Sequence, residues 1–496
     1  MQKLLFWVDS NLIQLFIAKI MKEQNQFELH AIFDHDSLDK TLYNQDTIFK
    51  NKWFFWDYVK KDYKPDLKYL KKFEKKYKID LWRIIIPERV FFNNYYHKFS
   101  KTEILGIIEQ ECKFFEKLLD QVNPDFLIMR MYDLHRLVLL KDMCIARGIN
   151  VLMIQNTRVA KRVIISSSGT KFDNIEGNVN ISSNTNFKQS VEFFKNNNKS
   201  LQFKKVKGGG VDSSLLLKIK SIIIFFLDVF DKNYTKSYDH YGMSLGKILI
   251  FRIKKIFKSK FRKRFLDSHS FIPQNITEKF IYFPLHVQPE RTIDVDADFY
   301  QDQISLVEKI AKSVPIEYVL YVKENPNMRF RNWRKIEEYK RILNLPNVRL
   351  VHYLANPLDL ISKSSLVITI AGSAGQEAAL YEKPSIVFSD VNYEWLSSVT
   401  KIKNLEKLPE EIKKSLNTNV EKQELEKLYE FYKLNTFEFD STDLDNKILD
   451  RFHNEGYLPK DNILVKELDL FLEENRQIFV QLTEEYVKKI IWWNKK

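Results

Sequence analysis

The sequence predicts an α/β protein with two parallel-sheet domains, a helical linker and a C-terminal helical tail. Short, continuous apolar runs alternate with helical stretches along residues 1–170 and again along 279–410, as in parallel sheets covered on both faces. A length of 496 residues exceeds what one hydrophobic core usually holds. A segment rich in Asn, Ser and Lys, at 173–200, separates the two series.

The composition limits the classes of partner that we expect. The chain has 79 Lys and Arg against 65 Asp and Glu, a formal net charge of +14, which favours an anionic substrate or surface. The basic residues are spread along most of the chain and no nucleic-acid-binding motif is present, so we expect no nucleic-acid partner. Two cysteines, Cys112 and Cys144, are too few for a disulfide framework or a zinc site, which favours a reducing compartment.

The first domain is assigned to residues 1–170. Each of its apolar runs is five or six residues long and is followed by a helical stretch, the order of a βα series. We expect strands at Leu4–Val8, Leu29–Phe33, Leu81–Ile86, Phe126–Met131 and Val151–Gln155.

The linker is assigned to residues 171–278. Its composition predicts a loop from Asp173 to about Ser200 and a further break at the three glycines 208–210. The apolar run 221–230 contains an aspartate and is too short to span a bilayer, and the N-terminus lacks the pattern of a signal peptide. We therefore expect a cytoplasmic protein.

The end of the linker, Lys247–Phe265, is predicted to be a basic helix. It contains nine Lys and Arg residues and no acidic residue. Its apolar residues recur at helical spacing, at Ile250, Ile253, Phe257 and Phe261. Two interpretations remain open: the apolar stripe lies on an anionic membrane surface, or it packs on the second domain.

The second domain is assigned to residues 279–410, and 411–496 to C-terminal helices. Helices are expected between its strands, notably at Phe299–Ser313 and Ser373–Tyr381. The expected strands are Phe280–Leu285, Glu317–Lys323, Val348–His352, Leu366–Ala371 and Ser385–Phe388.

Ligands of open parallel sheets bind beyond the carboxyl ends of the strands, so the residues that follow each strand are the candidate site residues. They are polar or small in both domains. In the first domain they are Asp9–Asn11, Asp34–Asp36, Arg130 with Asp133, and Gln155–Arg158. In the second they are His286–Arg291, Lys323–Pro326, Ala371–Gly375 and Ser389–Asp390.

The turn Ala371–Gly375 is the most specific of these segments. A strand ends there and a helix begins at once, so small residues let a phosphate approach backbone N–H groups at the helix N-terminus. Glu377, in the first turns of the helix, has the chemistry to accept hydrogen bonds from ribose hydroxyls. The alternative is a tight strand–helix turn whose small residues serve only packing.

Three segments, YFPLHVQPERT, LYVKENPNM and ITIAGSAGQEAALYEKP, resemble in order and spacing the capsule-polysaccharide biosynthesis proteins. That family is related to the bacterial Kdo transferases. The resemblance covers Phe280 to Leu408 well and the first 170 residues only in general pattern. It implies a GT-B glycosyltransferase fold, in which two Rossmann-like domains face a cleft. It also implies a nucleotide-sugar donor, commonly a CMP-activated acidic sugar, held as co-substrate by the C-terminal domain without a separate cofactor.

The resemblance assigns donor-site residues by motif. Lys323 ends a strand as in the family, but the family's His-Pro pair is Asn325-Pro326 here, and Asn cannot carry a proton at neutral pH. Either Lys323 and the Ser373 turn carry the phosphate, or the donor differs, or activity is lost. The predicted nucleotide-sugar contacts are Lys323, Asn325, Gly372, Ser373, Ala374, Gly375, Glu377 and Gln288.

An inverting transfer needs a base on the acceptor hydroxyl, and the resemblance places it on the first domain. Asp9 is the first candidate, Asp133 and Asp34 the alternatives; a helix N-cap is the structural interpretation of Asp9. His286 is assigned with Asp9 to catalysis, to orient donor or acceptor. Arg158 and Arg162 are candidates for binding an anionic acceptor. No metal-ligand spacing is present, so a metal-free mechanism is expected.

The function predicted from these residues is a glycosyltransferase of surface polysaccharide synthesis that acts on a glycan or glycolipid acceptor, with an anionic membrane surface as a further partner. The alternatives are a non-catalytic assembly partner with a degenerate donor site and a sugar-nucleotide epimerase of the same architecture.

Overall fold

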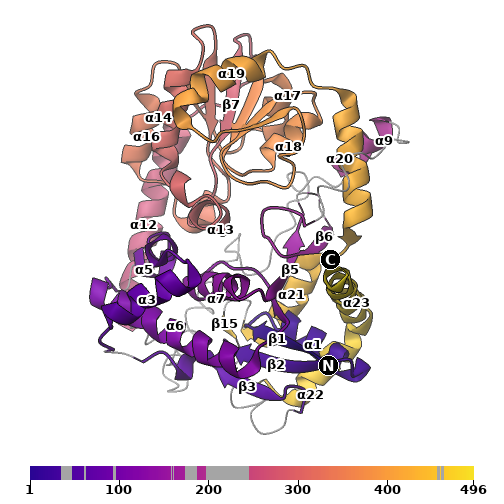
Figure 1. Cartoon of the computed structure of the whole chain (residues 1–496). Coiled ribbons are helices and arrows are strands. Elements are labelled where there is room, and N and C mark those ends of the chain that lie inside the picture. Colours follow the sequence, from indigo (N-terminus) through magenta and orange to yellow (C-terminus); the bar gives the residue numbers. More distant parts are fainter. Residues whose placement is uncertain are drawn as a thin grey trace.

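The computed structural model describes residues 1–34, 47–60, 63–92, 97–157, 159, 161–173, 187–196, 245–454, 458–459 and 463–495. The predicted fold class is confirmed: two α/β domains, each around a largely parallel sheet, lie one above the other (Figure 1). The glycines 208–210 and the apolar run 221–230 lie outside the described residues.

The first sheet has the strand order β13-β6-β5-β4-β1-β2-β3. Strands β1 to β5 are parallel, β6 is antiparallel to β5, and β13 is antiparallel to β6. The bounds are Gln2–Val8 for β1, Phe27–Phe33 for β2, Asn51–Phe54 for β3, Phe126–Met129 for β4, Asn150–Asn156 for β5, Arg162–Ser166 for β6 and Phe437–Glu438 for β13.

Helices cover both faces of this sheet. One face packs on α3 (Leu67–Tyr77), α4 (Leu81–Ile85), α5 (Arg89–Phe92), α6 (Lys101–Val122) and α7 (His135–Ala146). The other face packs on α1 (Ile13–Gln24) together with helices from the end of the chain, α21 (Ser441–Phe452), α22 (Val465–Glu474) and α23 (Arg476–Asn494). A short hairpin, β14 (His453–Asn454) with β15 (Leu458–Pro459), follows α21.

The strand predicted at Leu81–Ile86 is wrong, because the segment forms α4. Leu81, Ile84 and Ile85 are buried, whereas Trp82 and Ile86 are exposed. Burial at positions i, i+3 and i+4 is the periodicity of a helix with one face on the core, and a continuous apolar run conceals it.

The second sheet has the order β12-β11-β10-β7-β8-β9, and every strand is parallel to its neighbours. The bounds are Phe280–Pro284 for β7, Val319–Lys323 for β8, Val348–Val351 for β9, Leu366–Thr369 for β10, Ser385–Val387 for β11 and Val399–Lys401 for β12.

The larger core of the second domain lies between one face of this sheet and α14 (Gln303–Ser313), α16 (Ile336–Leu343), α19 (Leu408–Leu416) and α20 (Lys422–Asn435). The smaller core lies on the other face, under α17 (Pro357–Lys363) and α18 (Ala374–Ala379). Two short helices follow strand ends, α13 (Arg291–Asp294) after β7 and α15 (Met328–Arg331) after β8; single 3-10 turns occur at Phe55–Asp57, Asp298–Tyr300 and Leu405–Lys407.

The segments outside the two series also pack on the domains. Residues 187–196, predicted to lie in a loop, form helix α9 (Phe187–Asn196), whose Phe193 and Phe194 contact Tyr429 and Tyr432 of α20. The basic helix exists as α12 (Leu245–His269). Figure 1 shows α20 running from the second domain back toward the first, where α21 to α23 pack.

Candidate functional site

The switch point of the second sheet lies between β7 and β10, because the chain moves from β7 toward β9 on one side and from β10 toward β12 on the other. His286 follows β7 and Thr369 ends β10, and His286 Nε2 lies 3.1 Å from Thr369 Oγ1. The same hydroxyl accepts a hydrogen bond of 3.1 Å from the Gly372 backbone N–H. The two predicted strand ends therefore meet at one place.

Lys323 lies on the same face of this edge. Strand pairing places Lys323 opposite Pro284 and Val367 opposite Tyr282, so Thr369 is level with Pro284 on the other side of β7. Residues opposite each other in a parallel pair point to the same face, and two strand spacings put the Cα atoms of Lys323 and Thr369 about 10 Å apart. Helix α18 covers this face through Ala374 and Ala378.

The ammonium group of Lys323 is buried. It donates hydrogen bonds to the backbone carbonyls of Tyr353 (3.0 Å) and Glu324 (3.4 Å), and no carboxylate of the described residues lies within ion-pair distance. Burial lowers the pKa of Lys323 to about 8, against a smaller opposing effect of Glu324. A buried cation with only carbonyl partners favours an anion at this strand end.

Lys323 and Glu324 are adjacent in the sequence but form no ion pair. Glu324 is fully buried and instead accepts hydrogen bonds from Arg334 Nε (3.0 Å) and the Tyr339 hydroxyl (2.8 Å). Arg334 also donates to the backbone carbonyl of His286 at 2.6 Å.

The backbone of His286 is also held by Gln303, whose side-chain oxygen accepts its N–H at 2.8 Å. Together with the Arg334 contact to the His286 carbonyl, this fixes the loop that follows β7 from both sides. The imidazole is therefore presented by a rigid backbone rather than by a mobile loop.

Gln288 and Asn325 are both used locally. Gln288 follows His286 by two residues, donates from Nε2 to Asp294 Oδ1 (3.0 Å) and accepts from Gln303 Nε2 (3.1 Å). The Asn325 side-chain oxygen accepts the Asn327 backbone N–H at 3.0 Å, which closes a turn before α15. In this structure both side chains shape the loops around the strand ends.

The glycines of the predicted phosphate turn make room for protein atoms. A Cβ on Gly372 would lie 2.6 Å from Thr369 Oγ1 and 2.9 Å from His286 Cε1. A Cβ on Gly375 would lie 2.5 Å from the Tyr393 hydroxyl, which itself donates to the Gly372 carbonyl. The small residues are thus required by packing, which was the alternative interpretation, while Gly372 itself remains partly exposed.

The helix that follows the turn is shorter than predicted, at six residues. Ser373 precedes it and remains partly exposed, whereas Ala374 and Glu377 are buried within it. The Glu377 carboxylate lies close enough to Tyr282 to raise the pKa of that phenol, which burial already raises. Glu377 thus belongs to the helix that covers the sheet face carrying Lys323.

The switch point of the first sheet lies between β1 and β4. Asp9 follows β1, and its carboxylate accepts the Asn11 backbone N–H at 2.9 Å. The N-cap position of α1 is occupied by Leu12, so Asp9 does not cap that helix. Burial raises the pKa of Asp9, against the attraction of the Arg130 guanidinium, which lowers it.

A side chain from the end of the protein reaches this edge. Asp445 of α21 pairs with Arg130 (3.2 Å) and accepts from Asn11 Nδ2 (2.9 Å). Arg130 and the Asn11 amide at the first switch point are therefore partnered by α21, whereas Asp9 is not.

The other first-domain candidates form separate pairs. Asp34 pairs with Arg136 at 2.8 Å, and burial raises the pKa of Asp34 to about 6, although Arg136 lowers it. Asp133 pairs with Arg89 at 2.7 Å. Arg162 donates to the side chain (2.7 Å) and the carbonyl (2.6 Å) of Thr436. His35, Asp36 and Arg158 lie outside the described residues.

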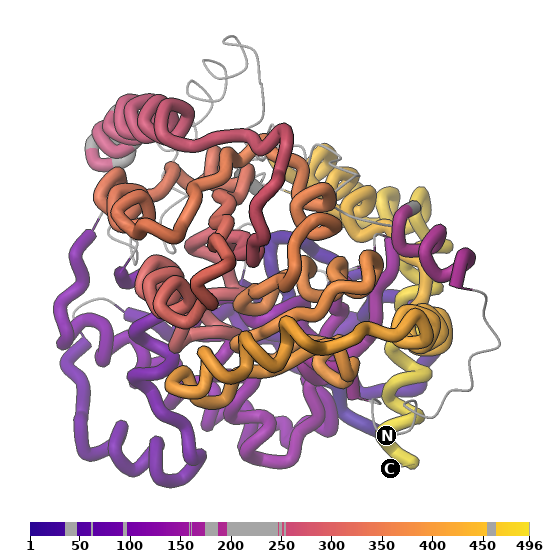
Figure 2. Tube along the Cα trace, turned by 90° about the horizontal axis from the view of Figure 1, so that it is seen from above, coloured from indigo at the N-terminus to yellow at the C-terminus, as the bar shows by residue number. Residues whose placement is uncertain are grey.

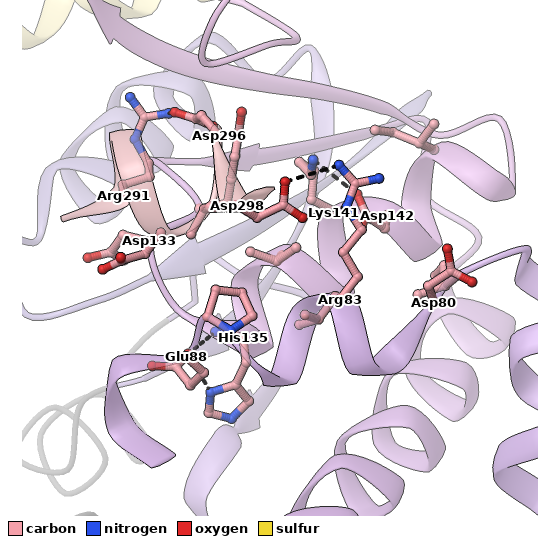
Figure 3. Close-up of a pocket in the computed structure, with 18 of the residues that line it drawn as sticks. Asp80, Arg83, Glu88, Asp133, His135, Lys141, Asp142, Arg291, Asp296 and Asp298 are labelled. Carbon is pink, nitrogen blue, oxygen red and sulfur yellow. Dashed lines mark hydrogen bonds and ion pairs between the residues drawn. The ribbon is translucent and has the colours of Figure 1, made fainter. Parts of the chain in front are cut away.

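A polar pocket of about 560 Å³ lies between the two domains (Figure 3). Its first-domain wall comes from α4, α7 and the loops beside them, and its second-domain wall from the segment around α13. Of the predicted candidates, Asp133, Arg291 and Asp390 line it, whereas Asp9, His286 and Lys323 do not. The pocket and the second switch point are thus neighbouring regions, linked by the Gln288–Asp294 hydrogen bond.

Cross-domain contacts surround this pocket. Arg83 pairs with Asp298 at 2.7 Å, and the Arg291 guanidinium lies 5.5 Å from the ring centroid of Tyr132. Charged groups on the walls are mostly paired, so the pocket offers many oriented donors and acceptors. Such a lining suits a polar, hydroxyl-rich ligand better than an apolar one.

Two titratable groups of the pocket were missed from the sequence. Burial raises the pKa of Asp294 to about 6, against hydrogen bonds from Gln288 and Glu290. His135 is buried between Glu88 (2.8 Å) and Glu111 (3.0 Å). Burial alone would lower the pKa of His135, but Glu111 and Glu88 outweigh it and raise that pKa to about 9.

Asp294 lies eight residues beyond His286, within a helix, so a search of the residues that directly follow each strand does not reach it. His135 lies at the start of α7 and Glu111 inside α6, where no spacing in the sequence connects them.

Neither a metal site nor a membrane span emerges from the described residues. No group of three or more His, Cys, Asp and Glu side chains there is arranged to hold a metal ion. None of the helices in the described ranges combines the length and apolar character needed to cross a bilayer.

No protein-family model and no curated protein matches the sequence. Among solved structures, the chain is similar to a KpsC β-Kdo 2,7-transferase of Thermosulfurimonas dismutans, with 14% identity over 71% of this chain and 87% of that one and a TM-score of 0.31. A KpsC β-Kdo 2,4-transferase of the same organism matches with 10% identity over 61% and 78% and a TM-score of 0.29.

The UDP-GlcNAc 2-epimerase of Methanocaldococcus jannaschii, solved in complex with UDP-GlcNAc and UDP, matches with 12% identity over 87% of this chain and 100% of that one, at a TM-score of 0.24. At such identities and TM-scores, these similarities assign neither an activity nor a substrate to this chain.

Proposed function

We propose that the protein is a glycosyltransferase that binds a nucleotide-sugar donor at the switch point of its second sheet. The observation that carries the proposal is the buried ammonium of Lys323, which has only carbonyl partners, on the same sheet face and edge as His286 and Gly372. A phosphate at this edge would be the anionic partner that the buried ammonium lacks among the described residues.

The donor would lie along the edge of β7, β8 and β10. Lys323 carries the phosphate charge, and the partly exposed Ser373 offers a backbone N–H donor beside it. Glu377 is the group nearest the start of α18 with the chemistry to accept from ribose. The resemblance of these segments to capsule-polysaccharide biosynthesis proteins supports a CMP-activated acidic sugar and a role in surface polysaccharide synthesis.

The acceptor would occupy the pocket between the domains, whose paired charges can hydrogen-bond sugar hydroxyls. For an inverting transfer, a carboxylate takes the proton of the acceptor hydroxyl while the hydroxyl oxygen forms the new glycosidic bond. The bond between the sugar and the donor phosphate breaks, and Lys323 stabilises the charge left on the nucleotide. Asp133 and Asp294 line the pocket and are the bases favoured there over Asp9.

Titration calorimetry with CMP, UDP, GDP and ADP tests the donor site. Lys323→Met should weaken binding of the preferred nucleotide at least tenfold, since a hydrogen bond to a charged group is worth about 1.5–3 kcal/mol. Lys312→Met, at an exposed lysine of α14, is the matched control and should bind as the wild type does. Binding should also weaken as the pH rises through about 8, where Lys323 loses its proton.

Product analysis with a panel of nucleotide sugars then separates the functions. Sugar transfer or donor hydrolysis supports the glycosyltransferase. Interconversion of epimers would replace it with the epimerase, and nucleotide binding without turnover would leave a non-catalytic assembly partner. Unchanged affinity in Lys323→Met would remove the switch point from the donor site.

A further inference from the structure

Helix α12 presents an apolar stripe to solvent. Ile250, Phe257 and Phe261 are 55%, 70% and 67% exposed, values far above those of most large apolar side chains in this protein. At 100° per residue these three side chains lie within about 40° of one another on the helix surface. The helix lies at the periphery of the molecule (Figure 2).

The opposite side of α12 holds it to the second domain. Leu266 is fully buried, Arg262 donates to the carbonyls of Asn332 and Trp333 at 2.9 Å each, and Lys255 donates to the carbonyl of Phe330. Of the two interpretations left open, packing of the stripe on the second domain does not hold for Ile250, Phe257 and Phe261. The side chain of Ile253 lies outside the described residues. The second domain packs on the opposite face of α12, and the stripe points away from that domain.

Basic residues flank the exposed stripe on both sides. Lys254 and Lys258 lie along one edge, and Lys260 and Arg264 along the other; all four are exposed. Between Lys247 and Phe265 there are nine basic residues and no acid. A narrow aromatic stripe between two cationic borders matches the chemistry of an anionic lipid surface, with the rings at the headgroup boundary and the cations among the phosphates.

We propose that α12 docks the protein on an anionic phospholipid bilayer, with Phe257 and Phe261 inserted at the interface. Each basic residue held near such a surface strengthens binding about fivefold, so several together with two inserted rings hold the protein there without a spanning segment. This surface is separate from the donor edge and from the pocket between the domains, so the proposal stands whether or not the proposed transferase activity does.

Flotation with vesicles tests it. At about 0.1 M NaCl the wild type should float with vesicles of phosphatidylcholine containing phosphatidylglycerol and remain in solution with phosphatidylcholine alone. Phe257→Ser with Phe261→Ser should lose at least tenfold in vesicle binding, and Ile316→Ser, at a fully exposed isoleucine of the same domain, should lose nothing. The charge reversals Lys254→Glu, Lys258→Glu and Lys260→Glu together should abolish binding. Reversal of the exposed Lys413 and Lys414 of α19 is the matched control.

The insertion of α12 at the bilayer interface can be measured directly. Cys112 and Cys144 are buried, so Phe257→Cys introduces an accessible thiol for an environment-sensitive dye. Dye emission should rise and shift to the blue with anionic vesicles, while the same dye on Ile316→Cys stays unchanged. Absent wild-type flotation, equal flotation with neutral vesicles, or full binding by the double serine variant would each overturn the proposal. Retention on an oligonucleotide without flotation would mean that the helix binds another polyanion.

Discussion

The two sheets have the same kind of switch point, but side chains fill the two edges differently. In the first domain, Asp445 of α21 pairs with Arg130 and accepts from Asn11, so the cation at this edge already has an acidic partner. In the second domain, Lys323 has no acidic partner among the described residues, and Gly372 and Ser373 stay partly exposed. The same topology thus gives one edge closed by protein atoms and one edge able to take an anion.

This difference teaches that strand-end position alone does not assign a site. Both edges satisfy the rule that ligands bind beyond the carboxyl ends of parallel strands. Only the partners of each side chain distinguish them, and the partner that closes the first edge lies more than 430 residues from Asp9 along the chain.

The largest expected effect comes from the buried pair behind the second switch point. Arg334→Met leaves the Glu324 carboxylate buried and unpaired, so the free energy of unfolding should fall by about 3–5 kcal/mol. Urea denaturation measures it. The double variant Glu324→Gln with Arg334→Met should recover most of the loss. A single variant as stable as the wild type would mean that this pair does not hold the His286 loop.

A second effect is a pH dependence of stability that comes from the first domain. His135 gains protons on folding, because its pKa rises from 6.5 to about 9. Its contribution to stability is therefore complete below pH 6.5 and is lost as the pH rises through about 9, a change of roughly 3 kcal/mol. His135→Gln should flatten this alkaline decline in urea denaturation at several pH values. A decline of equal size in that variant would assign it to other groups.

The acid limit of the same cluster follows from Glu88, the partner of His135. The pKa of Glu88 falls from 4.5 to about 2: burial opposes the shift, and His135 with two backbone N–H groups outweighs it. Its contribution is complete above pH 4.5 and is lost as the pH falls through 2.

Gly372→Ala should disturb the second switch point alone. The added Cβ meets Thr369 Oγ1 and His286 Cε1 at distances that real Cβ atoms do not show, so these two side chains must shift and their contact is disturbed. We expect a loss of about 1–3 kcal/mol in unfolding free energy and at least a tenfold loss in nucleotide affinity. Ser373→Ala, whose side chain caps no N–H group in this structure, should keep its stability within about 0.5 kcal/mol.

The smallest effect is expected at the first switch point. Asp445→Asn removes the charge of a partly exposed ion pair, which is worth less than about 1 kcal/mol in water. Denaturation should detect little change, and nucleotide affinity should stay that of the wild type. Stronger nucleotide binding in this variant would show that α21 masks a site on the first sheet.

The sequence predicts the two sheets well because buried parallel strands are continuous apolar runs, and the expected positions of β1, β2, β4, β5 and β7 to β11 match the structure closely. It predicts the strand ends at or after which His286, Lys323 and Gly372 lie for the same reason. It does not predict the short edge strands β3 and β12, in each of which one residue is buried. Strand β6 is missed as well, although four of its five residues are buried.

Partners of side chains are harder to predict than strands. Lys323 and Glu324 are neighbours in the sequence, but Arg334 and Tyr339 donate hydrogen bonds to the glutamate, and the lysine contacts only backbone carbonyls. His135 between Glu88 and Glu111 depends on how α6 and α7 pack, which no local pattern encodes. Asp9 is found at the predicted edge, yet the pocket between the domains is lined by Asp133 and Asp294 instead.

The return of the chain to the first domain has a consequence for its synthesis. Leu444, Phe471 and Phe479 belong to the same core as β1 and α1, and Gln2 and Asn494 exchange hydrogen bonds at the two ends of the described chain. During synthesis, one face of the first sheet therefore stays uncovered until the last helices have been made. At 5–20 residues per second this takes roughly 15–65 s after residue 170. The second domain, continuous in the chain, finishes first, so a nascent chain stalled before α21 exposes the uncovered apolar face of β1 and is the form most prone to aggregate.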